Sequence, residues 1–312
     1  MRFFLIPILL IFTLNAHAEV MRVIILGSGT PRPDIERFSQ SILIEVNNEK
    51  LLFDSGRGAT IRLNQANIPL KEIKKVFLTH LHSDHTIGLP DIIMTGWIYQ
   101  RDGVLNIYGP KGTIGLVDNL KKAYSEDISI RTVPPENHSL EGLKTKVIEI
   151  EEGLIYQKEK LKVYAIRVDH GGGVKNAFGY KIVNDDQSIV ISGDTNYSSN
   201  LIKHAKYCDV LIHEIASAPE KLIKKNAKIR GLMNYHTTPD EMARVIESVK
   251  PRLTILTHIL ALGGVSEKSI VKKIKNLNKK SYKIIMAHDL MAIDVKKDIQ
   301  IYSLDYSNDP KN

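Results

Sequence analysis

Four side chains that bind transition metals lie within residues 80–85, which read His80-Leu81-His82-Ser83-Asp84-His85. One residue separates His80 from His82, and Asp84 is adjacent to His85. On an irregular loop, the first pair can reach one metal ion and the second pair can reach a neighbouring one. Neutral imidazoles and a carboxylate suit Zn²⁺, with Mn²⁺ or Fe as alternatives. The spacing therefore predicts a centre for two metal ions, with zinc as the leading candidate.

Other apolar segments that are predicted to be strands also lead into metal-capable residues. Residues 76–78 precede the cluster just described, and four later segments precede further His, Asp or Glu side chains. These are 163–168 with Asp169 and His170, 188–191 with Asp194, 210–212 with His213 and Glu214, and 253–256 with His258. In α/β folds the loops at the carboxyl ends of strands converge to form sites. We therefore expect these side chains to meet in space.

The elements that must position these residues follow an α/β pattern with a mixed sheet system. A hairpin is predicted from strands 42–46 and 51–53, and further strands are predicted at 23–26 and 104–108. Thr238, Pro239 and Glu241 form a capping-box pattern that starts a helix. Other helices are predicted at 59–65, 114–124 and 266–277. No repeat or low-complexity linker divides the 312 residues.

The first eighteen residues have the pattern of a secretory signal peptide. Arg2 supplies a positive start, residues 3–14 are almost wholly apolar, and Ala16-His17-Ala18 has the small-x-small form of a cleavage site. The apolar segment is shorter than the roughly 20 residues of a membrane-spanning helix, and no other segment of the sequence could span a membrane. We expect a signal peptide at residues 1–18, one domain at 19–312, and a periplasmic or secreted protein.

Composition adds two weaker indications. The formal net charge of +8 would favour anionic partners, although a lysine-rich composition without any partner explains it as well. Five cations at Lys221, Lys224, Lys225, Lys228 and Arg230 form either a solvated helix face or an anion-attracting rim. Cys208 is the single cysteine, so no internal disulfide can form, and it is interpreted as a small buried hydrophobe.

The His-x-His-x-Asp-His motif, together with downstream His170, Asp194 and His258, resembles the metallo-β-lactamase superfamily. The resemblance is greatest to the branch of ribonuclease Z and the secreted bacterial arylsulfatases. It covers nearly the whole chain after residue 18. The matching motifs are Leu-Gly-Ser-Gly-Thr-Pro (26–31), Phe-Asp-Ser-Gly-Arg-Gly (53–58), the segment 78–85, Ala-Phe-Gly-Tyr (177–180), Ser-Gly-Asp-Thr (192–195), His-Glu (213–214), Tyr-His-Thr-Thr (235–238) and Leu-Thr-His-Ile (256–259). The fold that it implies is an αββα sandwich, with two mixed sheets face to face and helices outside.

The resemblance also implies a division of the metal ligands. His80, His82 and His170 would hold the first ion, Asp84, His85 and His258 would hold the second, and Asp194 would bridge both. β-Lactamases of this fold often carry Cys at the bridging position, so an Asp there points to the ester-cleaving branches.

Catalytic roles follow from the same resemblance. Two divalent ions would share a hydroxide, because metal binding lowers the pKa of water from about 16 toward about 7. Asp84 would orient this nucleophile or accept its proton. His236 would protonate the leaving group, or it is simply a loop imidazole before a capped helix. Glu214 would orient a ligand or His236.

Several other residues are weaker candidates. Gly27-Ser28-Gly29 begins like a dinucleotide-binding loop but lacks the third glycine and is followed by Pro31. Asp54 is expected to tie a turn near the site without binding metal. His138 and His204 are interpreted as surface residues, and His288 is not assigned to the site.

The sequence thus predicts an exported dinuclear zinc hydrolase of phosphodiester, phosphate-ester or sulfate-ester bonds, acting on a small anionic substrate. The alternative is a tRNA 3′-processing endoribonuclease. Export and the short connection 181–191, where bacterial ribonuclease Z usually has a long tRNA-gripping arm, argue against it, so nucleic acid is not the favoured substrate. A lactonase or thioesterase is a weaker option, and a non-enzymatic metal-binding protein is disfavoured because no family ligand is missing. A homodimer would fit the resemblance, but the sequence identifies no interface.

Overall fold

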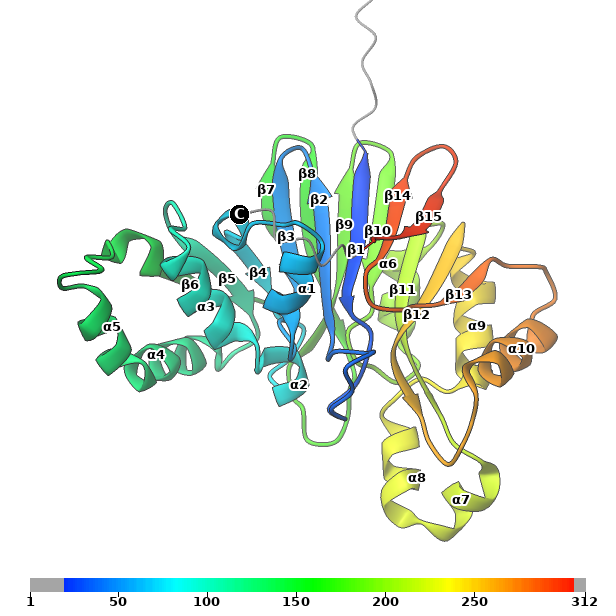
Figure 1. The fold of residues 1–312 in the computed structure, drawn as a ribbon. Helices are drawn as coiled ribbons and strands as arrows, with labels where there is room; N and C mark the ends of the chain where they lie inside the picture. Colours follow the sequence, from blue (N-terminus) through cyan, green and yellow to red (C-terminus); the bar gives the residue numbers. More distant parts are fainter. Residues whose placement is uncertain (1–19, 306–312) are drawn as a thin grey trace, which may run out of the picture.

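The computed structural model describes residues 20–305 and has four layers (Figure 1). Two β-sheets lie face to face, and helices cover their outer faces, which confirms the αββα sandwich. The predicted signal peptide at residues 1–18 lies outside the described residues. Within the described part, no helix combines the length and apolar character that crossing a membrane requires.

The first sheet has eight strands in the described chain, in the order β15-β14-β1-β2-β3-β4-β5-β6. The strands from β15 to β3 pair antiparallel, and those from β3 to β6 pair parallel. Their bounds are β1 (Met21–Gly27), β2 (Ser41–Val46), β3 (Glu49–Phe53), β4 (Lys75–Phe77), β5 (Leu105–Gly109), β6 (Thr145–Glu149), β14 (Met291–Val295) and β15 (Gln300–Ser303).

The second sheet has seven strands among the residues described, in the order β13-β12-β11-β10-β9-β8-β7. The strands from β10 to β13 are parallel, and those from β7 to β10 are antiparallel. Their bounds are β7 (Gly153–Lys158), β8 (Leu161–Val168), β9 (Ala177–Asn184), β10 (Gln187–Ile191), β11 (Val210–Ser217), β12 (Leu253–Ala261) and β13 (Ile284–Met286).

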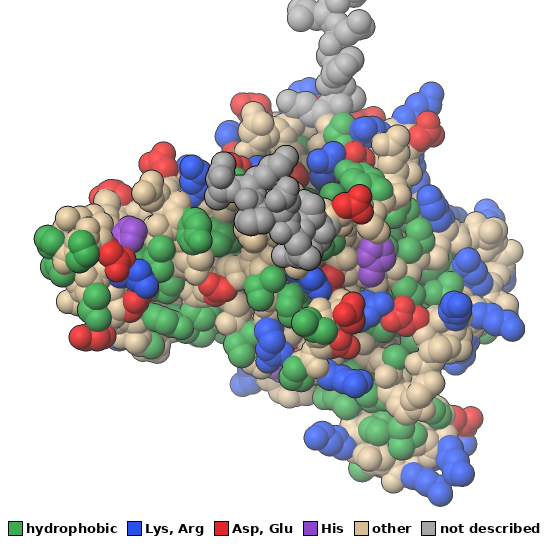
Figure 2. Space-filling view, in the orientation of Figure 1, with side chains coloured by type: hydrophobic (Ala, Val, Ile, Leu, Met, Phe, Trp, Pro, Cys, Tyr) green, Lys and Arg blue, Asp and Glu red, His purple; other side chains and the backbone are tan. Residues whose placement is uncertain are grey.

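Helices pack on both outer faces, while one helical pair stands apart. The first sheet carries α1 (Ala59–Gln65), α3 (Leu89–Ile98), α4 (Thr113–Ala123), α5 (Ser125–Arg131) and the short η1 (Leu70–Glu72) and η2 (Leu140–Leu143), and the second carries α6 (Ser199–Ala205), α9 (Pro239–Val249) and α10 (Glu267–Leu277). The short α2 (Ser83–Thr86) contains part of the His-rich motif. The pair α7 (Glu220–Lys225) and α8 (Ala227–Asn234) protrudes from the sandwich (Figure 1). Figure 2 shows Lys and Arg side chains at this protrusion and over α10.

Strand alternation separates the apolar side chains into three cores. In β1, Val23 and Ile25 face the space between the sheets, whereas Ile24 and Leu26 face the helices on the outer side. This follows from the period of two along a strand. Burial of apolar surface at about 25 cal/mol per Å² makes these cores the main favourable contribution to the fold.

Local sequence signals placed several elements correctly. Asn47 and Asn48 form the β2–β3 turn with φ of 50° and 60°, a conformation that asparagine tolerates. The Thr238–Glu241 capping box at α9 is confirmed, because each side chain pairs with the other residue's backbone N–H. Helices α1, α4 and α10 correspond to the predicted segments, and Ser266 caps α10.

The predicted ends of two strands are wrong. We expected the strands beginning at residues 210 and 253 to end before the metal-capable residues, but β11 runs through His213 and Glu214 and β12 runs through His258. The register shifts there, since Glu214 pairs with Thr257 and Ile215 pairs with Ile259. His258 is the extra residue of a β-bulge, with φ of 43°. A bulge re-aims a side chain without ending the sheet, and the apolar pattern gives no sign of it.

Candidate active site

The structure brings together all seven predicted metal ligands at one edge of the sandwich. They come from segments far apart in the chain: the loop after β4, helix α2, the loops after β8 and β10, and the bulge in β12. Six of the seven are buried and His82 is exposed. The seven are His80, His82, Asp84, His85, His170, Asp194 and His258.

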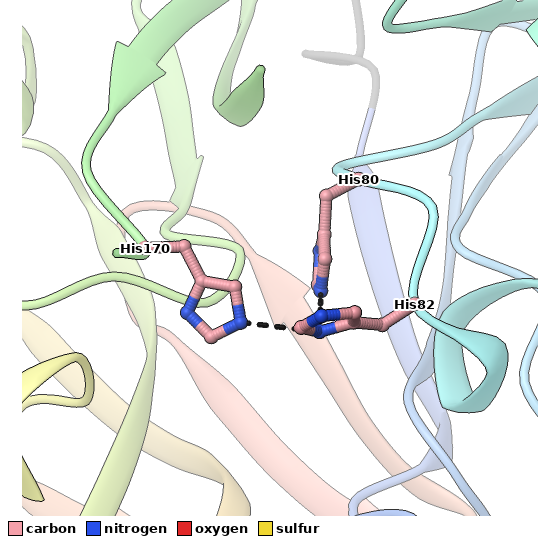
Figure 3. Close-up of side chains that lie close together, drawn as sticks. All are labelled: His80, His82 and His170. Atoms are coloured by element: carbon pink, nitrogen blue, oxygen red, sulfur yellow. Dashed lines mark hydrogen bonds between the residues drawn. The ribbon is translucent and has the colours of Figure 1, made fainter. Parts of the chain in front are cut away.

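The first predicted group consists of three imidazoles that face one another (Figure 3). The Nδ1 atom of His82 lies 3.0 Å from Nε2 of His80 and 3.2 Å from Nε2 of His170. Burial lowers the pKa of all three imidazoles, that of His80 most strongly. They are therefore neutral near pH 7, the state in which histidine binds metal.

The second predicted group is a carboxylate between two imidazoles. The Oδ2 atom of Asp84 lies 3.1 Å from Nε2 of His258 and 3.6 Å from Nε2 of His85. Asp194 lies between the two groups, with Oδ2 at 3.3 Å from Nε2 of both His85 and His258 and at 3.8 Å from Nε2 of His170. This position is the one that the sequence resemblance implied for a bridging ligand.

Two observations show that this donor set fits divalent cations. Within each of the two groups, the donor atoms all lie within 4.8 Å of one another. In addition, Nε2 of His85 and Oδ1 of Asp194 are buried without a hydrogen-bond partner among the described residues. Burial lowers the pKa of His85, but Asp194 and Asp54 outweigh it and raise this pKa well above its usual range. The space between these groups therefore attracts positive charge, and nitrogen and oxygen donors together suit zinc.

Asp54 has a larger part in the site than the sequence indicated. Its Oδ2 lies 2.7 Å from Nδ1 of His85, and its Oδ1 accepts a 2.8 Å hydrogen bond from the backbone N–H of Thr79. The carboxylate thereby fixes both the orientation of His85 and the loop that carries His80. Carboxylates commonly hold the far nitrogen of a metal-binding histidine in this way. The sign of this role in the sequence was the position of Asp54 directly after strand β3, which pairs with β4.

Glu214 and His236 form a pair at the rim of the cluster. The Oε1 atom of Glu214 lies 3.2 Å from Nδ1 of His236 and accepts a 2.8 Å hydrogen bond from the N–H of Thr237. Burial lowers the pKa of His236, but the Glu214 carboxylate outweighs it and brings this pKa to about 9. The His236 ring lies 5.1 Å from that of His170 and 5.6 Å from that of His258. His236 also completes two further groups of metal-capable atoms, so its position alone allows a proton donor or a ligand.

A pocket of about 300 Å³ opens onto the cluster. Besides the metal-capable residues, Arg32 and the side chains of Leu232, Tyr235 and Leu260 line it. Tyr235 packs against Gly172, and its backbone carbonyl lies 3.2 Å from Nδ1 of His170. Tyr235 belongs to the matching motif 235–238, but nothing in the local sequence marked it, Arg32, Leu232 or Leu260 as facing a site.

The loop that carries Arg32 is fastened at its base by charged side chains. Asp289 accepts hydrogen bonds from the N–H groups of Ser28 and Phe38. It also forms an ion pair with Arg62, at 3.0 Å between Nε and Oδ2. Arg37 donates to the carbonyl of Ala287 and pairs with Glu267. The base of the loop is thus fixed by hydrogen bonds and ion pairs, and Arg32 at its tip lines the pocket.

The remaining candidates lie outside the cluster. His213 is buried with Nδ1 2.8 Å from its neighbour's carbonyl, and exposed His288 contacts Ser303. A Cβ at Gly27 would lie 1.9 Å from the carbonyl oxygen of Ser39, so this glycine permits close backbone packing. Cys208 is buried, which raises the pKa of its thiol to about 12.

Comparison with known proteins agrees with this geometry. Residues 21–256 match the family described as anti-Pycsar protein Apyc1. Ribonuclease Z of Mycolicibacterium gilvum is 30% identical over 249 residues, which cover 77% of this chain and 84% of the relative. The metallo-β-lactamase fold protein YhfI of Bacillus subtilis has a TM-score of 0.70 and 18% identity, over 89% of this chain and all of YhfI. A diphosphatase of the PhnP family has a TM-score of 0.64 and 18% identity, over 88% of this chain and 98% of the diphosphatase.

The Asp54–His85 contact leads to a prediction about metal affinity. The substitution Asp54→Asn keeps the shape but removes the charge that holds Nδ1 of His85, and we expect zinc to bind roughly 10- to 100-fold more weakly. Competition with a chromophoric chelator measures this affinity. Asp34→Asn, at an exposed carboxylate of the N-terminal loop, is the matched control and should bind as the wild type does. An unchanged affinity in Asp54→Asn would show that this carboxylate has no part in holding the ligand.

Proposed function

We propose that this chain is an exported phosphodiesterase with two zinc ions. It belongs to the family of the anti-Pycsar protein Apyc1 and to the ribonuclease Z branch of the metallo-β-lactamase superfamily. The members of this branch are metal-dependent hydrolases. The observation that carries the proposal is the buried Asp194 carboxylate between two groups of ligands, each with three donor residues. One ion for each group, with a shared bridge, accounts for all seven residues.

The two groups of ligands around Asp194 would hold the ions, which when bound would supply an activated water and neutralise negative charge on the phosphoryl oxygens. The chain itself performs the remaining tasks. Asp84 orients the attacking water or accepts its proton, and His236 donates a proton to the leaving oxygen. Glu214 holds Nδ1 of His236, which keeps Nε2 available to the substrate. Arg32, which lines the pocket, attracts the anionic substrate.

A phosphodiester suits the charges of this site better than a carboxyl ester does. Arg32 lines the pocket, and the chain carries a formal net charge of +8, which favour an anionic substrate. The relatives point the same way, because a ribonuclease and a diphosphatase both cleave bonds to phosphorus. A sulfate ester would meet the same charges, so it remains in the panel of substrates to be tested.

A tRNA 3′-processing activity is the second candidate. The 30% identity to a ribonuclease Z over 84% of that enzyme favours it directly. Against it, β9 ends at Asn184 and β10 begins at Gln187, so this connection is a two-residue turn, as the sequence predicted, and carries no tRNA-gripping arm. The protruding α7–α8 pair carries five cations. Lys224 pairs with Glu220, and Arg230 donates to a backbone carbonyl. The other three, Lys221, Lys225 and Lys228, would have to take the place of an entire tRNA-gripping arm.

Titration of zinc into metal-free protein, combined with a substrate panel, tests this proposal. We expect hydrolysis of bis(p-nitrophenyl) phosphate to rise until two equivalents of zinc are bound, as measured by elemental analysis. Hydrolysis of p-nitrophenyl sulfate, a lactone and a precursor tRNA should be much slower. Activity that saturates at one equivalent would contradict the dinuclear centre, and efficient cleavage at the tRNA 3′ end would establish the second candidate.

The His236–Glu214 pair generates a prediction about leaving groups. We expect His236→Ala to keep its zinc and to lose roughly 10²- to 10⁴-fold in kcat on diesters with poor leaving groups. The loss should shrink for nitrophenolate, which departs without a proton. A series of aryl phosphodiesters with phenols of increasing pKa measures this dependence, and His288→Ala, outside the pocket, is the control. A loss that is equal across the series would remove proton donation from the role of His236.

Export is proposed from residues 1–18 alone. We expect a mature protein that begins at Glu19 in the periplasm or medium. Cell fractionation and N-terminal sequencing check this, and placing arginines at Leu9 and Leu10, within the apolar segment, should abolish export. A cytoplasmic protein that retains Met1 would contradict this part of the proposal and strengthen the tRNA alternative.

A further inference from the structure

A second pocket of about 240 Å³ adjoins the active site. Its lining is formed by Leu81, His82, Pro110, Lys111, Val174, Lys175 and Asn176. His82 also lines the pocket that opens onto the metal-capable cluster, so its exposed ring is shared by the two cavities. A substrate that is cleaved in the first pocket can therefore extend past this ring into the second.

The second pocket is built from both halves of the sandwich, as the metal cluster is. Lys111 lies in the turn between β5 and α4, which belongs to the first sheet. Lys175 lies in the loop between β8 and β9, which belongs to the second. Two cations from loops of different sheets thus line one small cavity, although 64 positions of sequence separate them.

Neither lysine is neutralised by a neighbour among the described residues. Both side chains are exposed, and no ion pair or hydrogen bond of either is found there. The nearest acidic residue along the adjoining strand, Glu149, accepts hydrogen bonds from the backbone N–H groups of Gly112 and Ile114 at 2.7 and 3.2 Å. Its carboxylate thus stabilises the first turn of α4, and among the described residues it forms no ion pair with Lys111.

The loop that carries Lys175 also connects the two pockets. It contains His170, followed by Gly171, Gly172 and Gly173, all with positive φ (63°, 56° and 91°). Only glycine adopts three successive residues of this kind at little cost. The cluster residue His170 and Lys175 are thus carried by the same glycine-rich loop, five positions apart.

We propose that the pocket lined by Lys111 and Lys175 binds a second phosphate group of a substrate whose scissile phosphodiester lies in the neighbouring pocket. The inference rests on the proposed phosphodiesterase function and narrows its substrate class to short nucleotide diesters with a terminal phosphate. Two exposed ammonium groups on one phosphate contribute a modest, salt-sensitive attraction. This interaction selects between substrates and leaves the chemistry to the neighbouring site.

Kinetics on matched dinucleotides test the proposal. Zinc-loaded protein is given uridylyl-uridine and its 5′- and 3′-phosphorylated forms, and the measured quantity is the ratio of kcat/KM for each phosphorylated form to that for the unphosphorylated one. We expect one phosphorylated form to be preferred about tenfold or more, and the preference to fall toward one in Lys111→Ala/Lys175→Ala and in high salt. Lys122→Ala, at an exposed lysine on α4, is the control and should keep the wild-type ratio.

Three outcomes would overturn the inference. The wild type could show no preference for either phosphorylated form, or the double variant could retain the preference. In the third outcome, kcat/KM of the double variant falls equally on all three dinucleotides, which would indicate a general effect of charge or folding. Calorimetric binding of the same dinucleotides to zinc-loaded His236→Ala provides a readout that does not need turnover. If bis(p-nitrophenyl) phosphate is not hydrolysed, the proposed function fails, while a binding preference that depends on the two lysines would still establish the phosphate pocket.

Discussion

Asp194 is a carboxylate that is only 3% exposed and lies within 4.0 Å of nitrogen atoms from four imidazole rings. A buried charge of this kind is costly unless positive charge lies beside it. Nearby His85 and His258 lower the pKa of Asp194 well below its usual range, against the effect of its burial. The surrounding structure serves this requirement, because the seven predicted ligands come from five segments of the chain and must all turn their donor atoms toward one another.

The two sheets meet this requirement by different means. In the first sheet, the strand β4 ends and the chain enters α2, with Asp54 from the neighbouring strand fixing Thr79 and His85. In the second sheet, β12 continues and a bulge turns His258 toward the cluster. A strained backbone at a ligand is maintained by the pairing on either side of it. The same bulge sets Glu214 opposite Thr257, so the strand that carries the partner of His236 is aligned with the strand that carries a metal-capable residue.

The sequence predicted the fold and the residues of the cluster because both depend on local patterns. Strands with apolar runs, helices with caps and a dense His-Asp motif are visible without knowledge of tertiary contacts. The bulge at His258 was not predicted, since a single extra residue leaves the apolar pattern unchanged. The contact of Asp54 with His85 depends on which strands are neighbours in the sheet. The pocket walls at Arg32, Leu232 and Tyr235 depend on how loops pack, which no periodicity describes.

The helical pair α7–α8 has a consequence for how this enzyme type diversifies. The pair lies between β11 and His236 and stands away from the sandwich (Figure 1). It contributes Leu232, at the end of α8, to the pocket wall but none of the seven predicted metal ligands, while Leu222 contributes to its attachment beside Gly263. Exchange of residues 218–234 for a segment of another length or charge would therefore remodel the pocket wall independently of the metal centre. Such an insert behaves as an interchangeable module, on which selection or design can act to change substrate preference while the catalytic core is inherited intact.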